Sequence, residues 1–205
     1  MNRVAIVDYG LCNVDSVARA VDECGGVATI TAEPSVLAAA DRIVLPGVGA
    51  FPDAMANLRS LGIDDALGVQ VLEQGAPFLG ICLGMQLLAA VGEEGAPTKG
   101  LGWIAATVRR LEPTEGRCRI PHMGWNEVHP KPKARLFAGV DPGTDFYFVH
   151  SFHVDCNDES TVAALTPYCG GFASAVELGS IFGVQFHPEK SQRAGFAILR
   201  NFLAV

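Results

Sequence analysis

Residues 76–90 constrain the fold of this chain more than any other stretch. The apolar run 77–79 predicts a buried strand, and good helix formers follow at 85–89. Between them, segment 80–84 has the pattern G-x-C-x-G with Cys82 at its centre. This pattern is typical of a nucleophile elbow, a tight strand-to-helix turn with a strained central residue and glycines as close neighbours. The start of the following helix would favour a thiolate. A buried structural cysteine in a Gly-rich turn fits the same pattern.

Short apolar runs alternate with amphipathic helices through the first half of the chain. The predicted strands are 3–7, 27–31, 42–45 and 77–79, and the predicted helices begin at Asn13 and cover 35–40, 51–61 and 65–73. This alternation predicts an α/β fold with a mostly parallel central sheet and helices on both faces.

After a loop at 92–102, the second half is rich in short strand candidates. They are 103–111, 127–129, 145–149, 161–165, 173–177 and 181–186, and an amphipathic helix closes the chain. No linker separates the halves, so we expect this β-rich extension to continue the first sheet within one domain, 1–205.

Composition excludes several classes of function. The net charge of −7 and the lack of a Lys/Arg cluster argue against nucleic-acid binding. No apolar run approaches the ~18 residues of a membrane span, and the start of the chain does not resemble a signal peptide. We therefore expect a cytoplasmic protein whose six cysteines are thiols. No C-x-x-C pair, G-x-G-x-x-G or Walker A pattern occurs, so neither a metal nor a nucleotide cofactor is predicted.

A nucleophilic cysteine needs a base and a group that orients the base. The segment 185–189 reads Gln-Phe-His-Pro-Glu. In extended backbone, residues i and i+2 point to the same side, so His187 and Glu189 can address one site. The carboxylate would fix the imidazole tautomer, and the imidazole would activate Cys82. A surface His-Pro-Glu turn is the alternative interpretation.

The segment 46–49, Pro-Gly-Val-Gly, follows a predicted parallel strand. In open α/β sheets, ligands lie beyond the carboxyl ends of the strands. Glycines there let backbone N–H groups point into a site, as an oxyanion hole requires. A tight βα loop without such a role would have the same composition. Of the other histidines, His122 fits a surface or structural residue, and His150 and His153 face opposite ways on a strand.

Six segments together resemble the class I (triad) glutamine amidotransferases over essentially the whole chain. They are 8–10 with Asn13, 46–51, 80–86, 121–126, 147–151 and 185–191. Within that family, Pro-Gly-Val-Gly and Pro-His-Met-Gly-Trp-Asn resemble the glutaminase subunits of imidazole glycerol phosphate synthase, from histidine biosynthesis. One departure is Cys12, which stands where the family often has glycine; a positive φ there would be strained for cysteine.

The resemblance implies a flavodoxin-like fold and hydrolysis of L-glutamine to glutamate and ammonia. It implies that Cys82, His187 and Glu189 form the triad. The backbone of Gly47, Val48, Gly49 and Leu83 would stabilise the oxyanion, and Gln86, Ser151 and Phe152 would hold the glutamine.

The resemblance also implies a heterodimer with a (β/α)₈-barrel cyclase subunit. The cyclase would use the ammonia to form imidazole glycerol phosphate and an aminoimidazole carboxamide ribonucleotide (AICAR). The residues that would face it are Asn13, His122, Met123, Trp125, Asn126 and Lys190. Three alternatives remain at this point: a glutaminase for another ammonia-using synthase, a cysteine hydrolase that acts alone, and a non-catalytic subunit. Lone hydrolases of this fold commonly carry histidine directly after the cysteine, where this chain has Leu83.

Overall fold

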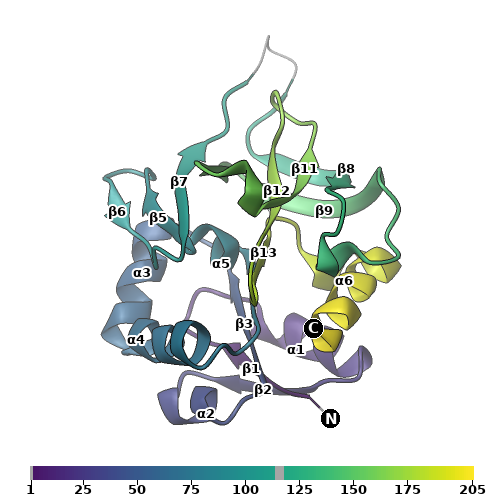
Figure 1. Ribbon diagram of the computed structural model, residues 1–205. Coiled ribbons are helices and arrows are strands. Elements are labelled where there is room, and N and C mark those ends of the chain that lie inside the picture. Colours follow the sequence, from purple (N-terminus) through teal and green to yellow (C-terminus); the bar gives the residue numbers. More distant parts are fainter. Residues whose placement is uncertain (1, 114–117) are drawn as a thin grey trace.

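The computed structural model describes residues 2–113 and 118–205 (Figure 1). Its first half contains β1 Arg3–Val7, α1 Val14–Glu23, β2 Val27–Thr31, α2 Pro34–Ala38, β3 Arg42–Gly47, α3 Phe51–Ser60, α4 Ile63–Gly68, a π-helical turn Val69–Glu73, β4 Phe78–Cys82 and α5 Leu83–Gln86. The second half contains β5 Ala89–Gly92, β6 Thr98–Lys99, β7 Ile104–Arg110, β8 His122–Pro130, β9 Thr144–His150, β10 Phe152–Cys156, β11 Val162–Thr166, β12 Phe172–Leu178, β13 Ile181–Val184 and α6 Gln192–Ala204, with 3₁₀ turns at Arg135–Phe137, Glu159–Thr161 and Pro188–Lys190.

The strands form a mixed sheet whose parallel part carries the elbow. Its order begins β2-β1-β3-β4-β13, and each neighbouring pair in this run is parallel. This is the flavodoxin-like order, with the last strand supplied from near the C-terminus. Strands β5 to β12 lie between β4 and β13 in sequence, and they continue the same sheet, mainly through antiparallel pairs. The predicted fold class is confirmed.

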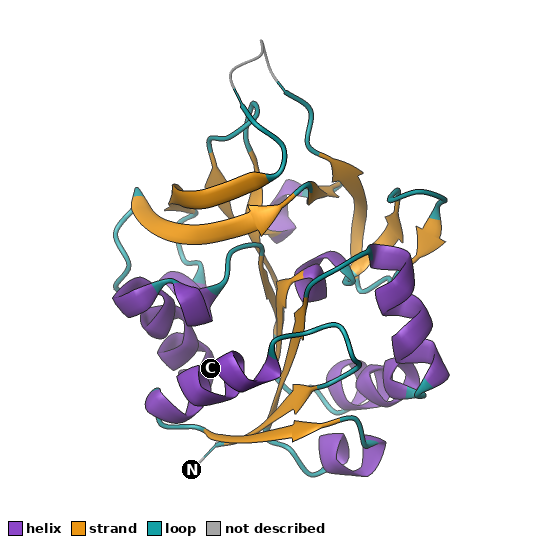
Figure 2. Ribbon diagram, turned by 180° about the vertical axis from the view of Figure 1, so that it is seen from behind, coloured by secondary structure: helices purple, strands orange, loops and turns teal. Residues whose placement is uncertain are grey.

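Helices cover both faces of the parallel strands, with α1 and α6 on one side and α3 and α4 on the other (Figures 1 and 2). Successive side chains of a strand point to opposite faces. In β1, Val4 and Ile6 pack into the core beneath α1 and α6, whereas Ala5 and Val7 pack into the core beneath α3 and α4. The apolar runs of β1, β3 and β4 are therefore strands buried on both faces, whereas β2 at the edge of the sheet is largely exposed.

Two predictions about local structure are wrong. The helix after the elbow has only four residues and ends at Gln86, because Ala89 pairs with Ile104 of β7 and begins strand β5. Tertiary pairing here overrides the helix propensity of 85–89. The predicted loop 92–102 also contains β6, which pairs with β5.

The prediction that all six cysteines are thiols is also wrong. Cys118 and Cys169 form a disulfide, whereas Cys12, Cys24, Cys82 and Cys156 are free. The two bonded residues are 51 positions apart, and the fold brings their Cα atoms to 5.6 Å. Their pairing depends on long-range folding, which cysteine spacing alone does not reveal.

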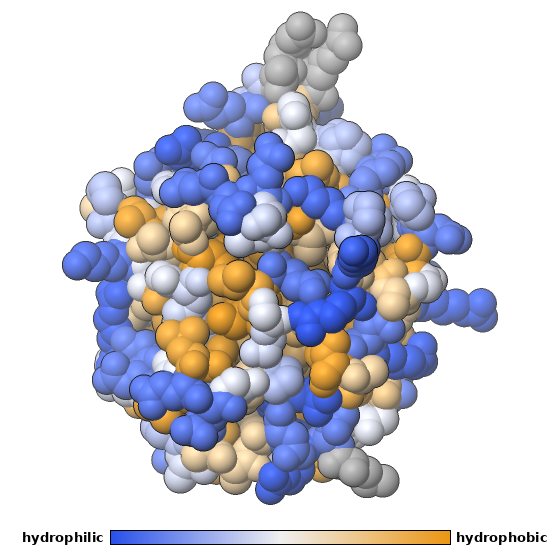
Figure 3. Space-filling model, in the orientation of Figure 1, coloured by the Kyte–Doolittle hydropathy of each residue, from blue (hydrophilic) through white to orange (hydrophobic). Residues whose placement is uncertain are grey.

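Large exposed apolar side chains occur on several elements, and on the face in Figure 3 they are interrupted by hydrophilic side chains. Within 2–113 and 118–205, no helix is long and apolar enough to cross a membrane.

Candidate active site

Cys82 lies at the end of β4 in a strained turn. Its φ is 54°, a value that non-glycine residues rarely adopt. The two glycines of the motif are required by close approach. A Cβ atom on Gly80 would lie 2.5 Å from the carbonyl oxygen of Gly84, and one on Gly84 would lie 1.8 Å from that of Leu45. The backbone turn predicted for segment 80–84 is therefore confirmed. With only four residues, α5 adds less dipole than a longer helix would.

The Pro-Gly-Val-Gly segment lies beside the elbow. Strand β3 pairs with β4 so that Gly47 is opposite Cys82. A Cβ on Gly47 would lie 2.2 Å from the hydroxyl oxygen of Tyr9, so a larger residue here would have to displace that buried ring. The backbone N–H of Val48 donates a hydrogen bond to the carbonyl oxygen of Leu11 at 2.8 Å. In this conformation that N–H does not point into the site.

His187 and Glu189 are paired, as the sequence predicts. Nδ1 of His187 lies 2.8 Å from Oε1 of Glu189, and both side chains are almost fully buried. The backbone differs from the prediction. His187 is extended, but Glu189 lies in the 3₁₀ turn Pro188–Lys190, so the turn, not a strand, brings the two side chains together.

Cys82 and Glu189 set the charge state of His187. Burial by itself would lower the pKa of the imidazole, but the Cys82 side chain and the Glu189 carboxylate outweigh it and raise the pKa to about 9. Within the described residues Nε2 of His187 makes no well-aligned hydrogen bond, but the Cys82 side chain lies near enough to raise the pKa of the ring. This ring is poised to exchange a proton with the sulfur.

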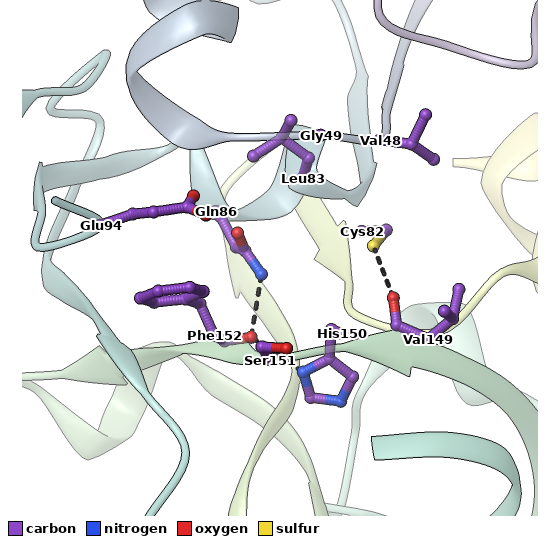
Figure 4. Close-up of a pocket in the computed structure, with 10 residues that line it drawn as sticks. All are labelled: Val48, Gly49, Cys82, Leu83, Gln86, Glu94, Val149, His150, Ser151 and Phe152. Atoms are coloured by element: carbon purple, nitrogen blue, oxygen red, sulfur yellow. Dashed lines mark hydrogen bonds between the residues drawn. The ribbon is translucent and has the colours of Figure 1, made fainter. Parts of the chain in front are cut away.

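A pocket of about 290 Å³ opens beside Cys82 (Figure 4). It is lined by Val48, Gly49, Cys82, Leu83, Gln86, Glu94, Val149, His150, Ser151 and Phe152. Sγ of Cys82 lies 3.9 Å from the carbonyl oxygen of Val149 and 3.5 Å from Nε2 of Gln185. Gln86 Nε2 donates to the carbonyl oxygen of Phe152 at 2.9 Å. The residues predicted to hold a substrate therefore line one cavity with Cys82.

Sequence reasoning missed two residues of this site. Glu94 extends into the same part of the pocket as Gln86 (Figure 4), and its carboxylate accepts a 2.8 Å hydrogen bond from the backbone N–H of Phe51. Gln185 is fully buried and bonds to both Gln86 and Cys82. Gln185 could have been predicted, because it is the first residue of the Gln-Phe-His-Pro-Glu segment. No sequence motif marks Glu94.

The residues predicted to face a partner separate into exposed and buried groups. Met123 and Trp125 on β8 are 63% and 49% exposed, and the ammonium of Lys190 lies 5.9 Å from the centre of the Tyr147 ring. Asn13 is exposed just before α1 and makes no capping bond with its side chain. The side chain of His122, by contrast, is buried. Cys12 avoids the positive φ that would strain it. Among the described residues, no group of three potential ligands is placed to hold a metal ion.

The chain is similar in sequence to known proteins over nearly its whole length. The family described as "Glutamine amidotransferase class-I" matches residues 5–205. The chain is 47% identical over 203 residues to "Imidazole glycerol phosphate synthase subunit HisH" of Moorella thermoacetica, covering 98% of this chain and 94% of that protein. It is 46% identical over 200 residues to the HisH 1 protein of Campylobacter jejuni strain RM1221, covering 98% of each.

Similarity to solved structures supports the assignment of the fold and nothing further. A putative GMP synthase protein from Thermoplasma acidophilum superposes with a TM-score of 0.75 at 22% identity, covering 100% of this chain and 93% of that one. The family match and the two HisH relatives confirm the resemblance drawn from the motifs. The chain belongs to the class I glutamine amidotransferases and, within them, to the HisH subunits of imidazole glycerol phosphate synthase.

Proposed function

We propose that residues 1–205 act as one domain, the glutaminase subunit of an imidazole glycerol phosphate synthase, and hydrolyse L-glutamine with Cys82, His187 and Glu189. The observation that carries this proposal is the buried 2.8 Å contact between His187 and Glu189 beside a cysteine on a strained elbow. A nucleophile, a base and a group that orients the base are the parts that covalent amide hydrolysis needs.

In the proposed reaction, Sγ of Cys82 attacks the carbonyl carbon of the glutamine side-chain amide. The shared proton of the pair lies on His187, whose pKa is raised to about 9, and His187 delivers it to the leaving nitrogen, so ammonia departs and a glutamyl thioester remains. A water molecule then attacks the thioester, His187 receives its proton, and Cys82 leaves as glutamate is released. Glu189 holds the imidazole through Nδ1 and stabilises its cationic form.

The oxyanion of each tetrahedral intermediate needs N–H donors. Leu83 supplies one, because the first N–H of a helix has no partner within that helix. Val48 with its neighbours Gly47 and Gly49 would supply another. The Val48 N–H is bonded to Leu11 in this conformation. The proposal therefore requires that the 47–49 loop moves before rapid turnover, which makes loop conformation a control point.

Polar groups around the pocket match the two ends of a glutamine molecule. We assign the substrate α-ammonium to the carboxylate of Glu94, which is already held by the Phe51 N–H. Gln86 and the backbone of Ser151 and Phe152 line the same pocket and would fix the rest of the amino acid.

The partner is proposed to be the (β/α)₈-barrel cyclase subunit, which receives the ammonia directly. Exposed Met123 and Trp125 lie on β8, and β9 beside it leads into the pocket through Val149 and His150. Large apolar side chains of this kind are common anchors at protein interfaces. The partner would thus contact the strands that form one wall of the site.

The test is a glutaminase assay of the chain alone and with the cyclase of the same organism, each with and without the cyclase nucleotide substrate. We expect slow hydrolysis by the chain alone and much faster hydrolysis by the substrate-bound complex. Cys82→Ala should abolish hydrolysis of glutamine while the complex still makes imidazole glycerol phosphate from added ammonia. Rapid hydrolysis without the partner would overturn the proposed coupling, and full activity of the Cys82 variant would overturn the mechanism.

A further inference from the structure

Two buried histidines, His122 on β8 and His150 on β9, lie beside the pocket, and the proposed reaction does not use them. They are opposite each other in the strand register and are 3% and 6% exposed. Nδ1 of His122 lies 2.9 Å from Nε2 of His150. The His122 ring is stacked on Tyr168, with 3.9 Å between ring centres. Buried imidazole rings need hydrogen-bond partners, and here the partners determine which atom donates and which accepts in each hydrogen bond.

The donor and acceptor roles follow from the carbonyl oxygen of Phe152, the acceptor at the inner end of this series of hydrogen bonds. Nδ1 of His150 lies 2.8 Å from the carbonyl oxygen of Phe152, which can only accept, so Nδ1 carries the proton. Burial lowers the pKa of His150 to about 3 and that of His122 to about 4, so both rings are neutral near pH 7. A neutral ring has one N–H, and Nε2 of His150 is therefore an acceptor. His122 must donate to it from Nδ1.

The same reasoning continues outward to Asn126. Nε2 of His122 is left as an acceptor and lies 3.2 Å from Nδ2 of Asn126, which donates. The orientation of that amide is fixed independently, because its Oδ1 accepts a 2.9 Å bond from the N–H of Glu127. The chain of donors therefore runs one way, from Asn126 through His122 and His150 to the Phe152 carbonyl.

The inner end of this chain meets the catalytic groups. The Phe152 carbonyl also accepts from Gln86, and Gln86 donates in addition to Oε1 of Gln185 at 3.0 Å. Gln185 in turn donates to Sγ of Cys82 at 3.5 Å. The outer end, Asn126, is half-buried on the strand that exposes Met123 and Trp125.

We propose that His122 and His150 are positioning residues that form a one-way hydrogen-bond relay from Asn126 to the glutamine site. The relay holds the Phe152 carbonyl and, through it, the amide of Gln86 in the orientation that receives substrate. Both rings would have to change tautomer together to reverse it, so a disturbance of Asn126 on β8 reaches the pocket as a change in hydrogen bonding. This proposal rests on the proposed glutaminase function and adds to it how the β8 strand is connected to the substrate site.

Two variants test the relay in the complex with the cyclase. His122→Phe keeps an aromatic ring on Tyr168 but cannot donate to His150. Losing one buried hydrogen bond of about 1–2 kcal/mol should raise KM for glutamine roughly 5- to 30-fold, with kcat changed much less. The matched control is His153→Phe: His153 is a half-buried histidine nearby in sequence and outside the relay, and its variant should leave KM unchanged.

Asn126→Asp is the sharper variant, because it changes shape little but removes the donor. A carboxylate forces His122 to carry its proton on Nε2, and His150 then loses its donor. Nitrogen-15 chemical shifts of the labelled rings, recorded on the chain alone, report the tautomers without any activity. We expect His150 protonated at Nδ1 in the wild type and the His122 proton moved to Nε2 in Asn126→Asp. An Nε2-protonated His150 in the wild type, unchanged tautomers in Asn126→Asp, or equal KM in His122→Phe and the control would each overturn the relay. A wild type without glutaminase activity would instead overturn only the proposed function.

Discussion

The backbone N–H of Val48 donates a hydrogen bond to the carbonyl oxygen of Leu11 at 2.8 Å. This N–H is therefore not available to the oxyanion that it is proposed to stabilise beside Cys82. We predict that this amide exchanges slowly with solvent deuterium in the chain alone. It should exchange faster in the complex with the cyclase, its nucleotide and glutamine, because the bond to Leu11 must break before the N–H can serve the intermediate. Amide exchange resolved at Val48 checks this. Turnover that rises while protection of Val48 stays constant would exclude the loop as the control point.

Replacing Glu189 by glutamine should lower the pKa of His187. The carboxylate helps to raise that pKa above the ordinary value of 6.5 to about 9, and a neutral amide cannot do so. Because the folded state favours the protonated ring, the stabilisation it brings is complete below about pH 6.5 and is lost as the pH rises through about 9. The loss of unfolding free energy between about pH 6 and about pH 10 should therefore be smaller in Glu189→Gln.

Urea unfolding at both pH values measures this difference, and His187→Gln serves as the reference that lacks the titrating ring. An equal pH dependence in the wild type and in both variants would show that His187 does not titrate as described.

Glu94→Gln should raise KM for glutamine roughly 10- to 150-fold with little change in kcat, because one charged hydrogen bond of about 1.5–3 kcal/mol to the substrate α-ammonium is lost. The amide oxygen of the new side chain can still accept from the Phe51 N–H, so the loop should keep its shape. Steady-state kinetics of the complex measure the effect. The matched control is Glu93→Gln, which lies at the surface 3.8 Å from Arg109. A KM as low as that of the control would remove Glu94 from the substrate site.

Gly84→Ala should destabilise the fold by about 3 kcal/mol or more, because its Cβ would overlap the backbone oxygen of Leu45. Gly68→Ala makes the same chemical change in helical backbone where a Cβ meets nothing within 4 Å. It should stabilise the fold by roughly 0.5–1 kcal/mol. Thermal and urea unfolding compare the two. Similar stabilities would mean that the elbow has room that the backbone geometry does not show.

The elbow and the triad pair were predictable because their signals are local. Glycine is required at positions 80 and 84 because neighbouring backbone atoms lie too close for a Cβ atom. His187 and Glu189 are close enough in sequence for a turn or a strand to bring them together. The inner parallel strands β1, β3 and β4 were also predictable, since apolar runs buried on both faces have no polar alternation.

The rest depended on long-range contacts. The short helix α5 ends because Ala89 pairs with Ile104, and the disulfide joins loops 51 residues apart. Glu94 becomes a pocket residue only because its loop packs over the start of α3. The bond between Val48 and Leu11, which decides whether an oxyanion hole exists, joins two loops whose sequences do not mark the pairing.

The central claim is that Cys82 forms a glutamyl thioester, and acid-quenched mass spectrometry of the complex during turnover tests it most directly. We predict a mass increase of one glutamyl group on the peptide that contains Cys82, absent from Cys82→Ala. A glutamyl group on Cys12, Cys24 or Cys156 instead, or steady release of glutamate by Cys82→Ala, would contradict it.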